Sequence, residues 1–125
     1  MKIIEKINKA EKEDTVIFSL EFFPPKTVDG VQNLYSRLDR MAMLSPSWVD
    51  VTCGPNGVTT EKSLQICSTA QQTIGLETMI HVTCTNVSKE EIEDTLKQAK
   101  QAGVRNILAL RGDPSKEDRG VFKHA

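Results

Sequence analysis

The chain has 125 residues and a formal net charge of −1, with 16 Lys and Arg residues against 17 Asp and Glu. This balance gives no electrostatic reason to expect nucleic acid or an anionic membrane surface as a partner. No apolar run approaches the roughly 20 residues of a transmembrane helix, and the Glu-rich start resembles neither a secretory signal nor a transit peptide. Three cysteines without paired spacing indicate reduced thiols and no metal site. We therefore expect one cytoplasmic domain without nucleic-acid or membrane partners.

The N-terminal segment predicts a short amphipathic helix over residues 1–14. Its apolar side chains recur at helical spacing, at Ile3, Ile4, Ile7 and Ala10. The β-rich run Val16–Phe22 then predicts a first strand, which ends in the stretch SLEFFPPKT. In that stretch the acidic Glu21 precedes two phenylalanines and then Pro24 and Pro25, which stop the strand.

Strand-like and helix-like segments alternate through the rest of the chain. Ser88 and Glu91 have the spacing of a capping box, and Gly103 fits the end of the helix that follows. Thr59 or Thr60 can cap the preceding helix. The strand ends recur about every 30 residues, which is typical of β-helix-β units with parallel strands. The later strands are expected over Trp48–Cys53, Thr78–Cys84 and Arg105–Leu110, and the helices around Val31–Met41, Leu64–Ala70 and Ile92–Ala99.

Two architectures fit this alternation, an open doubly wound sheet of flavodoxin type and part of a (β/α)8 barrel. Successive strand residues point to opposite faces. An open parallel sheet with helices on both faces should be apolar on both, whereas a barrel lumen becomes polar towards an active site at the C-terminal strand ends. The first β-to-α turn also lacks a glycine-rich phosphate loop, so we favour the barrel. The predicted apolar face is Phe18, Leu20, Phe22, Val49, Val51, Cys53, Ile80, Val82, Cys84, Leu108 and Leu110, and the predicted polar face is Ser19, Glu21, Asp50, Thr52, His81, Thr83, Ala109 and Arg111.

The length of the chain limits how much of a barrel it can form. A complete (β/α)8 barrel needs about 250 residues, and this chain offers four strands. We therefore expect the first four βα units of a TIM barrel, with the N-terminal helix over residues 1–14 and the four strands and a following loop over residues 15–125. The two outer strands would then be unprotected edges.

Glu21 is the first candidate for chemistry. Its ordinary interpretation is a solvated carboxylate at a strand end. Burial against apolar neighbours such as Phe22 and Phe23 raises the pKa of a carboxyl group, and a carboxylic acid of that kind donates protons near neutral pH. The prolines after it fix the backbone, so we expect Glu21 to be a proton donor held on a rigid strand end.

Other candidates lie at the ends of the third and fourth strands. His81 lies opposite Asp50 on the predicted polar face, where it is either a hydrogen-bonded core histidine or a ligand contact. The tripeptide Arg111-Gly112-Asp113 could suggest a cell-adhesion motif, but its place after a barrel strand favours a turn at the barrel mouth. There Gly112 would allow close backbone approach to a ligand, and Asp113 would bring a second carboxylate to the mouth. Thr52 and Thr83 also end strands, where β-propensity alone explains them.

Four motifs in this order resemble the methylenetetrahydrofolate reductase family: SLEFFPPKT, VTCGPNG followed by TTEKSL, GLETMIHVTCTN, and RNILALRGDP. The match runs from about Phe18 to Pro114, and QNLYSRLDRM and NILALRGDP resemble the eukaryotic members most. The resemblance implies a (β/α)8-barrel flavoprotein of one-carbon metabolism and methionine supply. Such an enzyme reduces 5,10-methylenetetrahydrofolate to 5-methyltetrahydrofolate, with FAD as the bound cofactor and NADPH or NADH as the reductant.

The resemblance also implies roles for individual residues. Glu21 matches the general acid that helps to open the five-membered ring of the folate substrate. Asp113 matches an acidic residue near flavin and pterin, which makes it both cofactor-binding and substrate-binding. Cys53 stands where the family usually has an aromatic residue that contacts the flavin. Flavin or nicotinamide contacts are implied for Thr52, His81, Arg111 and Gly112.

The resemblance leaves two functional interpretations of the chain. In the first, the complete enzyme is a homo-oligomeric reductase of which this chain is the N-terminal half-barrel, inactive by itself. In the second, the chain is a non-catalytic fragment or a partner subunit of such a reductase. No metal is implied in either case.

Overall fold

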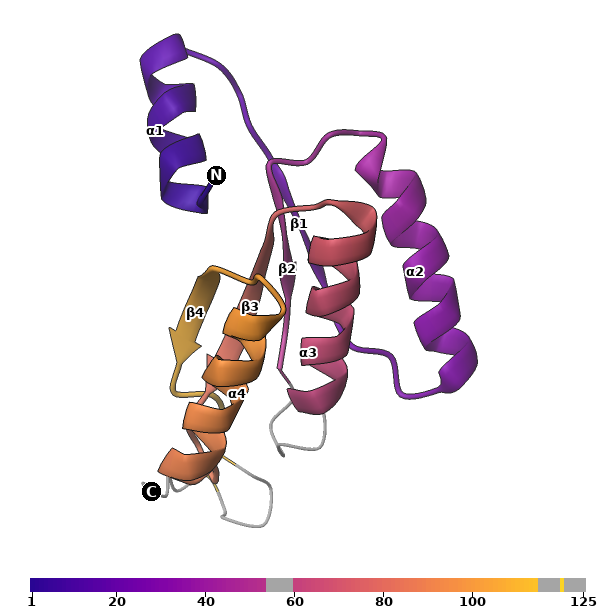
Figure 1. The fold of residues 1–125 in the computed structure, drawn as a ribbon, viewed down its shortest axis with the longest axis vertical. Coiled ribbons are helices and arrows are strands. Elements are labelled where there is room, and N and C mark those ends of the chain that lie inside the picture. The colour runs from indigo at the N-terminus through magenta and orange to yellow at the C-terminus, as the bar shows by residue number, and fades with distance from the viewer. Residues whose placement is uncertain (54–59, 115–119, 121–125) are drawn as a thin grey trace.

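The computed structural model describes residues 1–53, 60–114 and 120. Helices and parallel strands alternate along it (Figure 1). No helix in these described segments is long and apolar enough to cross a membrane. In chain order the elements are α1 (Ile3–Glu13), β1 (Ser19–Phe22), α2 (Val28–Ala42), β2 (Trp48–Val51), α3 (Thr60–Thr69), the π-helical turn η1 (Ala70–Ile74), β3 (Thr78–Thr83), α4 (Lys89–Gln101) and β4 (Asn106–Leu110).

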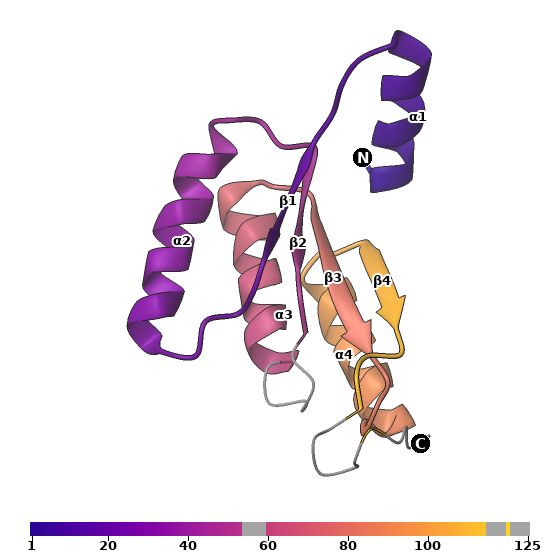
Figure 2. The ribbon, with the colours of Figure 1, turned by 180° about the vertical axis from the view of Figure 1, so that it is seen from behind.

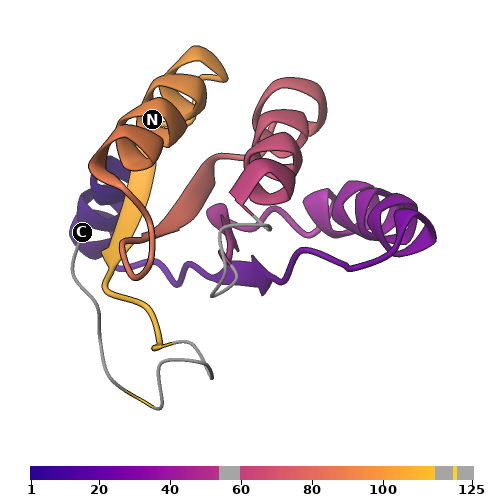
Figure 3. The same ribbon diagram turned by 90° about the horizontal axis from the view of Figure 1, so that it is seen from below.

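The four strands form one parallel sheet whose spatial order, β1-β2-β3-β4, is also the chain order. Figures 1 and 2 view the sheet from opposite sides, and Figure 3 shows α2, α3 and α4 together on one side of it. A doubly wound sheet has helices on both faces. The one-sided arrangement in chain order is that of a barrel wall, which confirms the expected class, part of a (β/α)8 barrel.

Strand register defines the two faces of the sheet, because partners in neighbouring parallel strands point the same way. One face packs against the crossover helices, and Val49, Val51 and Ile80 on it are fully buried. Leu38 of α2 and Cys67 of α3 meet it from the helix layer, also fully buried. The opposite face is called the open face here, and it consists of Ser19, Glu21, Trp48, Asp50, Met79, His81, Thr83, Asn106, Leu108 and Leu110.

The predicted faces are confirmed for the first three strands and wrong for β4. Leu108 pairs with His81 and Leu110 with Thr83, so both leucines lie on the open face. Ala109 pairs with Val82 and therefore lies on the helix side. The sequence NILAL is apolar at nearly every position, so its alternation does not reveal which residues point inward. As an edge strand β4 also leaves these side chains accessible, with Leu108 37% and Leu110 40% exposed.

Helix α1 is the predicted N-terminal helix, and it lies at the end of the sheet where the strands begin (Figure 1). The backbone N–H of Ile3 donates to Asn106 Oδ1 at 3.0 Å. Asn106 Nδ2 donates in turn to Glu77 Oε1 at 2.7 Å, and Arg105 Nη2 donates to Glu77 Oε2 at 2.8 Å. This network fixes α1 to the N-terminal ends of β3 and β4. Of the four apolar residues predicted on α1, Ile3 and Ala10 are buried while Ile4 and Ile7 are exposed.

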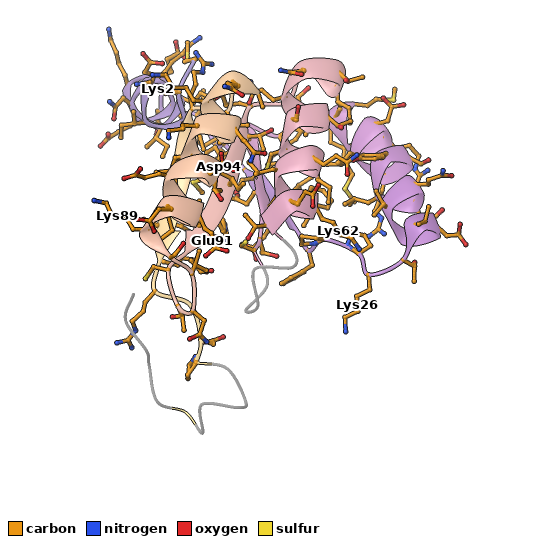
Figure 4. All side chains as sticks on the ribbon, turned by 60° about the horizontal axis from the view of Figure 1, so that its bottom comes forward. Lys2, Lys26, Lys62, Lys89, Glu91 and Asp94 are labelled. Atoms are coloured by element: carbon orange, nitrogen blue, oxygen red, sulfur yellow. The ribbon has the colours of Figure 1, made fainter. Side chains whose placement is uncertain are left out.

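Helix α4 begins with the predicted capping box. Ser88 Oγ accepts from the backbone N–H of Glu91 at 3.2 Å, and Glu91 Oε2 accepts from the backbone N–H of Ser88 at 2.8 Å. Gly103 follows the helix with φ +79°, as expected for a helix C-terminus. Figure 4 shows Lys89 and Glu91 near one end of α4 and Lys62 near the corresponding end of α3. The predicted cap Thr59 lies outside the described residues, and Thr60 is the first residue of α3.

Candidate active site at the carboxyl ends of the strands

The carboxyl ends of the strands meet along one edge of the sheet, opposite the edge that α1 covers (Figure 2). We call this edge the rim, and it comprises Thr52, Cys53, residues 83–85 and residues 110–114. Glu21 and His81 lie close to the rim on the open face. All the candidate residues predicted from sequence therefore lie on the open face or the rim, while the Gly-Pro-Asn-Gly loop after Cys53 lies outside the described residues.

Glu21 is on β1, directly opposite Asp50 of β2. Its neighbour Phe22 points to the helices and is 6% exposed, whereas Phe23 is 72% exposed. Glu21 itself is exposed. The expected burial of its carboxylate against Phe23 is therefore wrong for the described chain. Alternation sends Phe22 to the other face of the sheet, and Phe23 lies beyond the end of the strand without covering its neighbour.

Asp50 is the buried carboxylate of the open face, 6% exposed. The indole Nε1–H of Trp48 donates to its Oδ2 at 3.0 Å, and His81 Nε2 lies 3.6 Å from its Oδ1. Burial raises the pKa of Asp50, and the nearby charge of Glu21 acts in the same direction. The Trp48 hydrogen bond and the proximity of His81 oppose this increase without cancelling it.

His81 is 7% exposed, and its Nε2 is buried without a hydrogen bond among the described residues. A buried polar atom of this kind costs free energy unless something satisfies it. Its Nε2 lies 3.6 Å from Asp50 Oδ1, which is too far for a hydrogen bond. The Trp48 indole nitrogen, by comparison, lies 3.0 Å from the other oxygen of the same carboxyl group. The sequence allows His81 to be either a hydrogen-bonded core residue or a ligand contact. The structure shows a buried histidine whose Nε2 lacks a hydrogen bond among the described residues.

The turn after β4 is bound to β3. The backbone N–H of Thr85 donates to the Arg111 carbonyl at 3.1 Å, and the Thr85 hydroxyl donates to the same oxygen. Gly112 has φ +80°, and a Cβ built on it would lie 3.1 Å from Thr83 Cβ. Glycine is therefore needed here because the backbone is left-handed and packs on Thr83. The sequence suggests that a ligand approaches the Gly112 backbone closely. In the structure the group that lies against this backbone is the side chain of Thr83.

The backbone of Thr52 and the side chain of Cys53 are held by α3. Ser63 Oγ donates to the Thr52 carbonyl at 2.7 Å, and Cys53 Sγ lies 3.2 Å from Thr60 Oγ1. Cys53 also lines a cavity of about 140 Å³ at the rim. Binding pockets for small molecules usually measure about 300–1,000 Å³, so this cavity by itself is smaller than a typical ligand pocket. The cavity is lined by Cys53, Thr83, Thr85, Leu110, Gly112 and Asp113.

The structure thus separates the predicted residues into two groups. Glu21 and His81 gather around Asp50 on the open face, while Cys53, Gly112 and Asp113 line the rim cavity. The sequence predicts Asp113 as the second carboxylate at the same mouth as Glu21. In the structure the carboxylate directly opposite Glu21 belongs to Asp50, and Asp113 lines the rim cavity. Within the described residues no group of three or more His, Cys, Asp or Glu side chains could hold a metal ion.

Two residues of this site, Asp50 and Trp48, were absent from the predicted site. Alternation placed Asp50 on the polar face and opposite His81, which was the signal available in the sequence. Trp48 lies two residues earlier and so shares that face, but a large aromatic residue at the start of a strand predicts only the strand. Its indole N–H, which needs an acceptor when it is shielded from water, was the overlooked clue.

Comparison with known proteins identifies the family. A model of methylenetetrahydrofolate reductase matches residues 6–125. The chain belongs to the methylenetetrahydrofolate reductase family. This confirms the resemblance found in the four sequence motifs. The methylenetetrahydrofolate reductase family generally uses FAD and a reduced nicotinamide.

Three relatives illustrate the match. The chain is 46% identical over 114 residues to a probable methylenetetrahydrofolate reductase (NADH) of Oryza sativa subsp. japonica, covering 91% of this chain and 19% of that protein. It is 48% identical over 118 residues to methylenetetrahydrofolate reductase 1 of Schizosaccharomyces pombe, covering 94% and 20%. It is 39% identical over 114 residues to a probable methylenetetrahydrofolate reductase (NADPH) of Caenorhabditis elegans, covering 87% and 17%. The chain spans about a fifth of the length of these relatives.

Proposed function

We propose that this chain is the N-terminal half of a methylenetetrahydrofolate reductase catalytic barrel, with its open face forming part of the active site. The observation that carries the proposal is the position of Glu21 beside Asp50 and His81 at the carboxyl ends of parallel strands, where barrel enzymes hold their substrates. The reaction is the reduction of 5,10-methylenetetrahydrofolate to 5-methyltetrahydrofolate in the cytoplasm. The reductant is NADPH or NADH, and the names of the rice and nematode relatives include one of each.

The described residues fit a flavin as the cofactor. The imidazole of His81 lies on the open face close to the rim, and Thr52 and Thr83 carry half-buried hydroxyl groups at the rim itself. Arg111 adds a cation at the same edge, suited to a phosphate or carboxylate. When bound, FAD would carry the hydride from the nicotinamide to the folate. Thr52, Cys53, His81, Arg111, Gly112 and Asp113 are the residues proposed to hold it.

Glu21 is the proposed general acid. Its exposed carboxyl group lies on the open face, so a folate seated there could receive its proton on the departing nitrogen of the five-membered ring. Asp113 is proposed to supply a negative charge near the pterin, because a fixed charge aimed at a developing cation stabilises it. The bound folate and flavin would then provide the apolar cover for Glu21 that Phe23 does not.

The test uses a chimera in which residues 1–125 replace the matching segment of the Schizosaccharomyces pombe reductase. Glu21→Gln in this chimera should retain NAD(P)H-dependent reduction of the bound flavin and lose folate-dependent reoxidation by about 10²–10⁴-fold. Glu61→Gln is a matched control, since Glu61 is an exposed glutamate on the first turn of α3. A chimera that binds FAD and reduces folate equally well with Glu21→Gln would refute the assigned role.

The half-barrel proposal makes a separate claim about the chain by itself. The edge strand β4 leaves Ile107, Leu108 and Leu110 about two-fifths exposed, which suits strands that pair with others. We propose that the 125-residue chain alone neither binds FAD stoichiometrically nor reduces folate. Flavin absorbance and a reductase assay on the isolated chain test this, and light scattering on the same chain shows whether it is a monomer or associates. A stable, flavin-free monomer would count against the need for a partner, and FAD binding with reductase activity would refute the half-barrel proposal.

A further inference from the structure

Trp48, Asp50 and His81 form a connected group on the open face. Trp48 and Asp50 come from alternate positions of β2, and His81 comes from the adjacent strand β3. The Trp48 indole donates to Asp50 Oδ2 at 3.0 Å, which leaves Oδ1 on the side of His81, 3.6 Å from Nε2. The side chains of Asp50 and His81 are each 9% exposed, so water does not surround the gap between them.

The chemistry of this contact decides which imidazole nitrogen carries hydrogen. An ionised carboxylate only accepts hydrogen bonds. The nitrogen that faces Asp50 must therefore be an N–H, and that nitrogen is Nε2. Since Nε2 has no other partner among the described residues, a small inward movement towards Asp50 would satisfy it. Nδ1 is then the ring nitrogen that remains for a ligand.

We propose that Asp50 is a positioning residue of the candidate site: fixed by Trp48, it orients the His81 imidazole as the Nε2–H tautomer and leaves Nδ1 for the ligand at the rim. This inference rests on the proposed function for the identity of that ligand. In the neutral ring Nδ1 accepts a hydrogen bond, and in the protonated ring it donates one. Nδ1 can therefore meet a hydrogen-bond donor of the ligand when the ring is neutral, or an acceptor when the ring is protonated.

The groups around Asp50 shift its pKa in opposite directions. Glu21 faces it from β1, and its negative charge raises the pKa of Asp50. His81 faces it from β3 and lowers that pKa, as does the hydrogen bond from Trp48. On the helix side, Cys67 of α3 has a pKa of about 12 and stays neutral at the pH values concerned. Removal of Glu21 or of His81 should therefore move the titration of Asp50 in opposite directions.

The chain offers a direct reporter, because Trp48 is its one tryptophan. In ¹⁵N-labelled protein the single indole N–H signal should shift as Asp50 titrates, with a midpoint above the ordinary aspartate value of 3.8. His81→Gln should raise that midpoint, since it removes the group whose charge and hydrogen bond lower the pKa of Asp50. Glu21→Gln should lower it. Asp50→Asn keeps an oxygen that can accept from Trp48 and should abolish the inflection.

Matched controls use His124, the other histidine of the chain, and Glu13, an exposed glutamate at the far end of α1. His124→Gln and Glu13→Gln should leave the Trp48 midpoint unchanged. Equal midpoints for His81→Gln and His124→Gln would overturn the proposal. At neutral pH, long-range ¹H–¹⁵N spectra of the unmodified chain should show the Nε2–H form of His81, and the Nδ1–H form would overturn the proposal without any variant. Neither flavin nor folate is used, so these outcomes are independent of the reductase test.

Discussion

Glu21 and Asp50 lie directly opposite each other on β1 and β2, two carboxylates in register on the same face of a parallel sheet. Like charges in directly opposed positions destabilise a sheet. Here the charge of Glu21 also raises the pKa of Asp50, whose burial has the larger effect. Stability alone gives little reason to keep this pair, and the general-acid role proposed for Glu21 would supply one.

The Glu21–Asp50 pair predicts that the charge of Glu21 lowers the stability of the folded chain. Glu21→Gln should raise the free energy of unfolding at neutral pH by about 0.2–1 kcal/mol, because it removes the repulsion. The gain should shrink in high salt, since Glu21 is exposed. Urea denaturation of Glu21→Gln, Asp50→Asn and the double variant measures the coupling. If the gain from Glu21→Gln persists in the Asp50→Asn background, the two carboxylates do not interact.

Gly112 and Gly75 provide a matched pair for the rim turn. Both have left-handed φ, +80° and +81°, but a Cβ on Gly112 would meet Thr83 at 3.1 Å, whereas one on Gly75 would meet nothing within 4 Å. Gly75→Ala should therefore cost about 1 kcal/mol for the backbone alone. Gly112→Ala should cost about 1 kcal/mol more, because Thr83 or the turn must move. Thermal unfolding of the two variants gives the comparison, and equal losses would show that Thr83 does not restrict the turn.

The three cysteines should react with a thiol reagent at different rates. Burial raises the pKa of Cys67 to about 12, so the native protein holds almost none of the reactive thiolate there. Cys84 is exposed and Cys53 is half-buried. The order of labelling by Ellman's reagent should be Cys84, then Cys53, with Cys67 modified only after denaturation. Cysteine-to-serine variants assign each phase, and rapid modification of Cys67 in native protein would contradict the core packing between α3 and the sheet.

The capping box of α4 predicts a stability change with a defined pH dependence. Ser88→Ala should lower the free energy of unfolding by about 1 kcal/mol through loss of the side-chain cap. The hydrogen bond from the Ser88 backbone lowers the pKa of Glu91 below its ordinary 4.5. The contribution of Glu91 is therefore complete above pH 4.5 and is lost as the pH falls through the lowered value.

Glu90 is the control for that pH dependence, because it lies in the same first turn of α4. Glu91→Gln should be less stable than the unmodified chain at neutral pH, and the difference should vanish in acid. Glu90→Gln removes a carboxylate from the same turn without touching the capping box, so the pH dependence of Glu91→Gln is measured against it. Denaturation midpoints measured across this pH range provide the test. A difference for Glu91→Gln that does not change with pH would exclude the capping carboxylate as its source.

The order of the elements and the orientation of three strands could be predicted from the sequence. In β1, β2 and β3 the polar residues interrupt an apolar series at every second position, so the two faces are distinguishable. The limits of α4 could also be predicted. Ser88 caps the first turn with its side chain, and Gly103 adopts the left-handed backbone that ends the helix. The one-sided helix layer followed from this pattern, because a face with Glu21, Asp50 and His81 cannot be covered by helices without partners for those groups.

The errors arose where local patterns carry no information. In NILAL both faces of β4 are apolar, so the orientation of Leu108 depended on pairing with His81, which is a long-range contact. The exposure of Glu21 depended on what covers the open face, and neighbours in sequence do not decide that. Phe23 follows Glu21 directly and yet is 72% exposed. The distance between Asp50 and His81 is likewise set by sheet geometry between β2 and β3.

The agreement between chain order and spatial order in the sheet has a consequence for synthesis on the ribosome. Each strand pairs with the one made just before it, and the intervening helix is complete before the next strand appears. A nascent chain can therefore add β2 to β1, then β3, then β4, without waiting for a distant segment. At every stage β1 remains one edge of the sheet and the newest strand is the other, so each new strand covers the edge left by the strand before it.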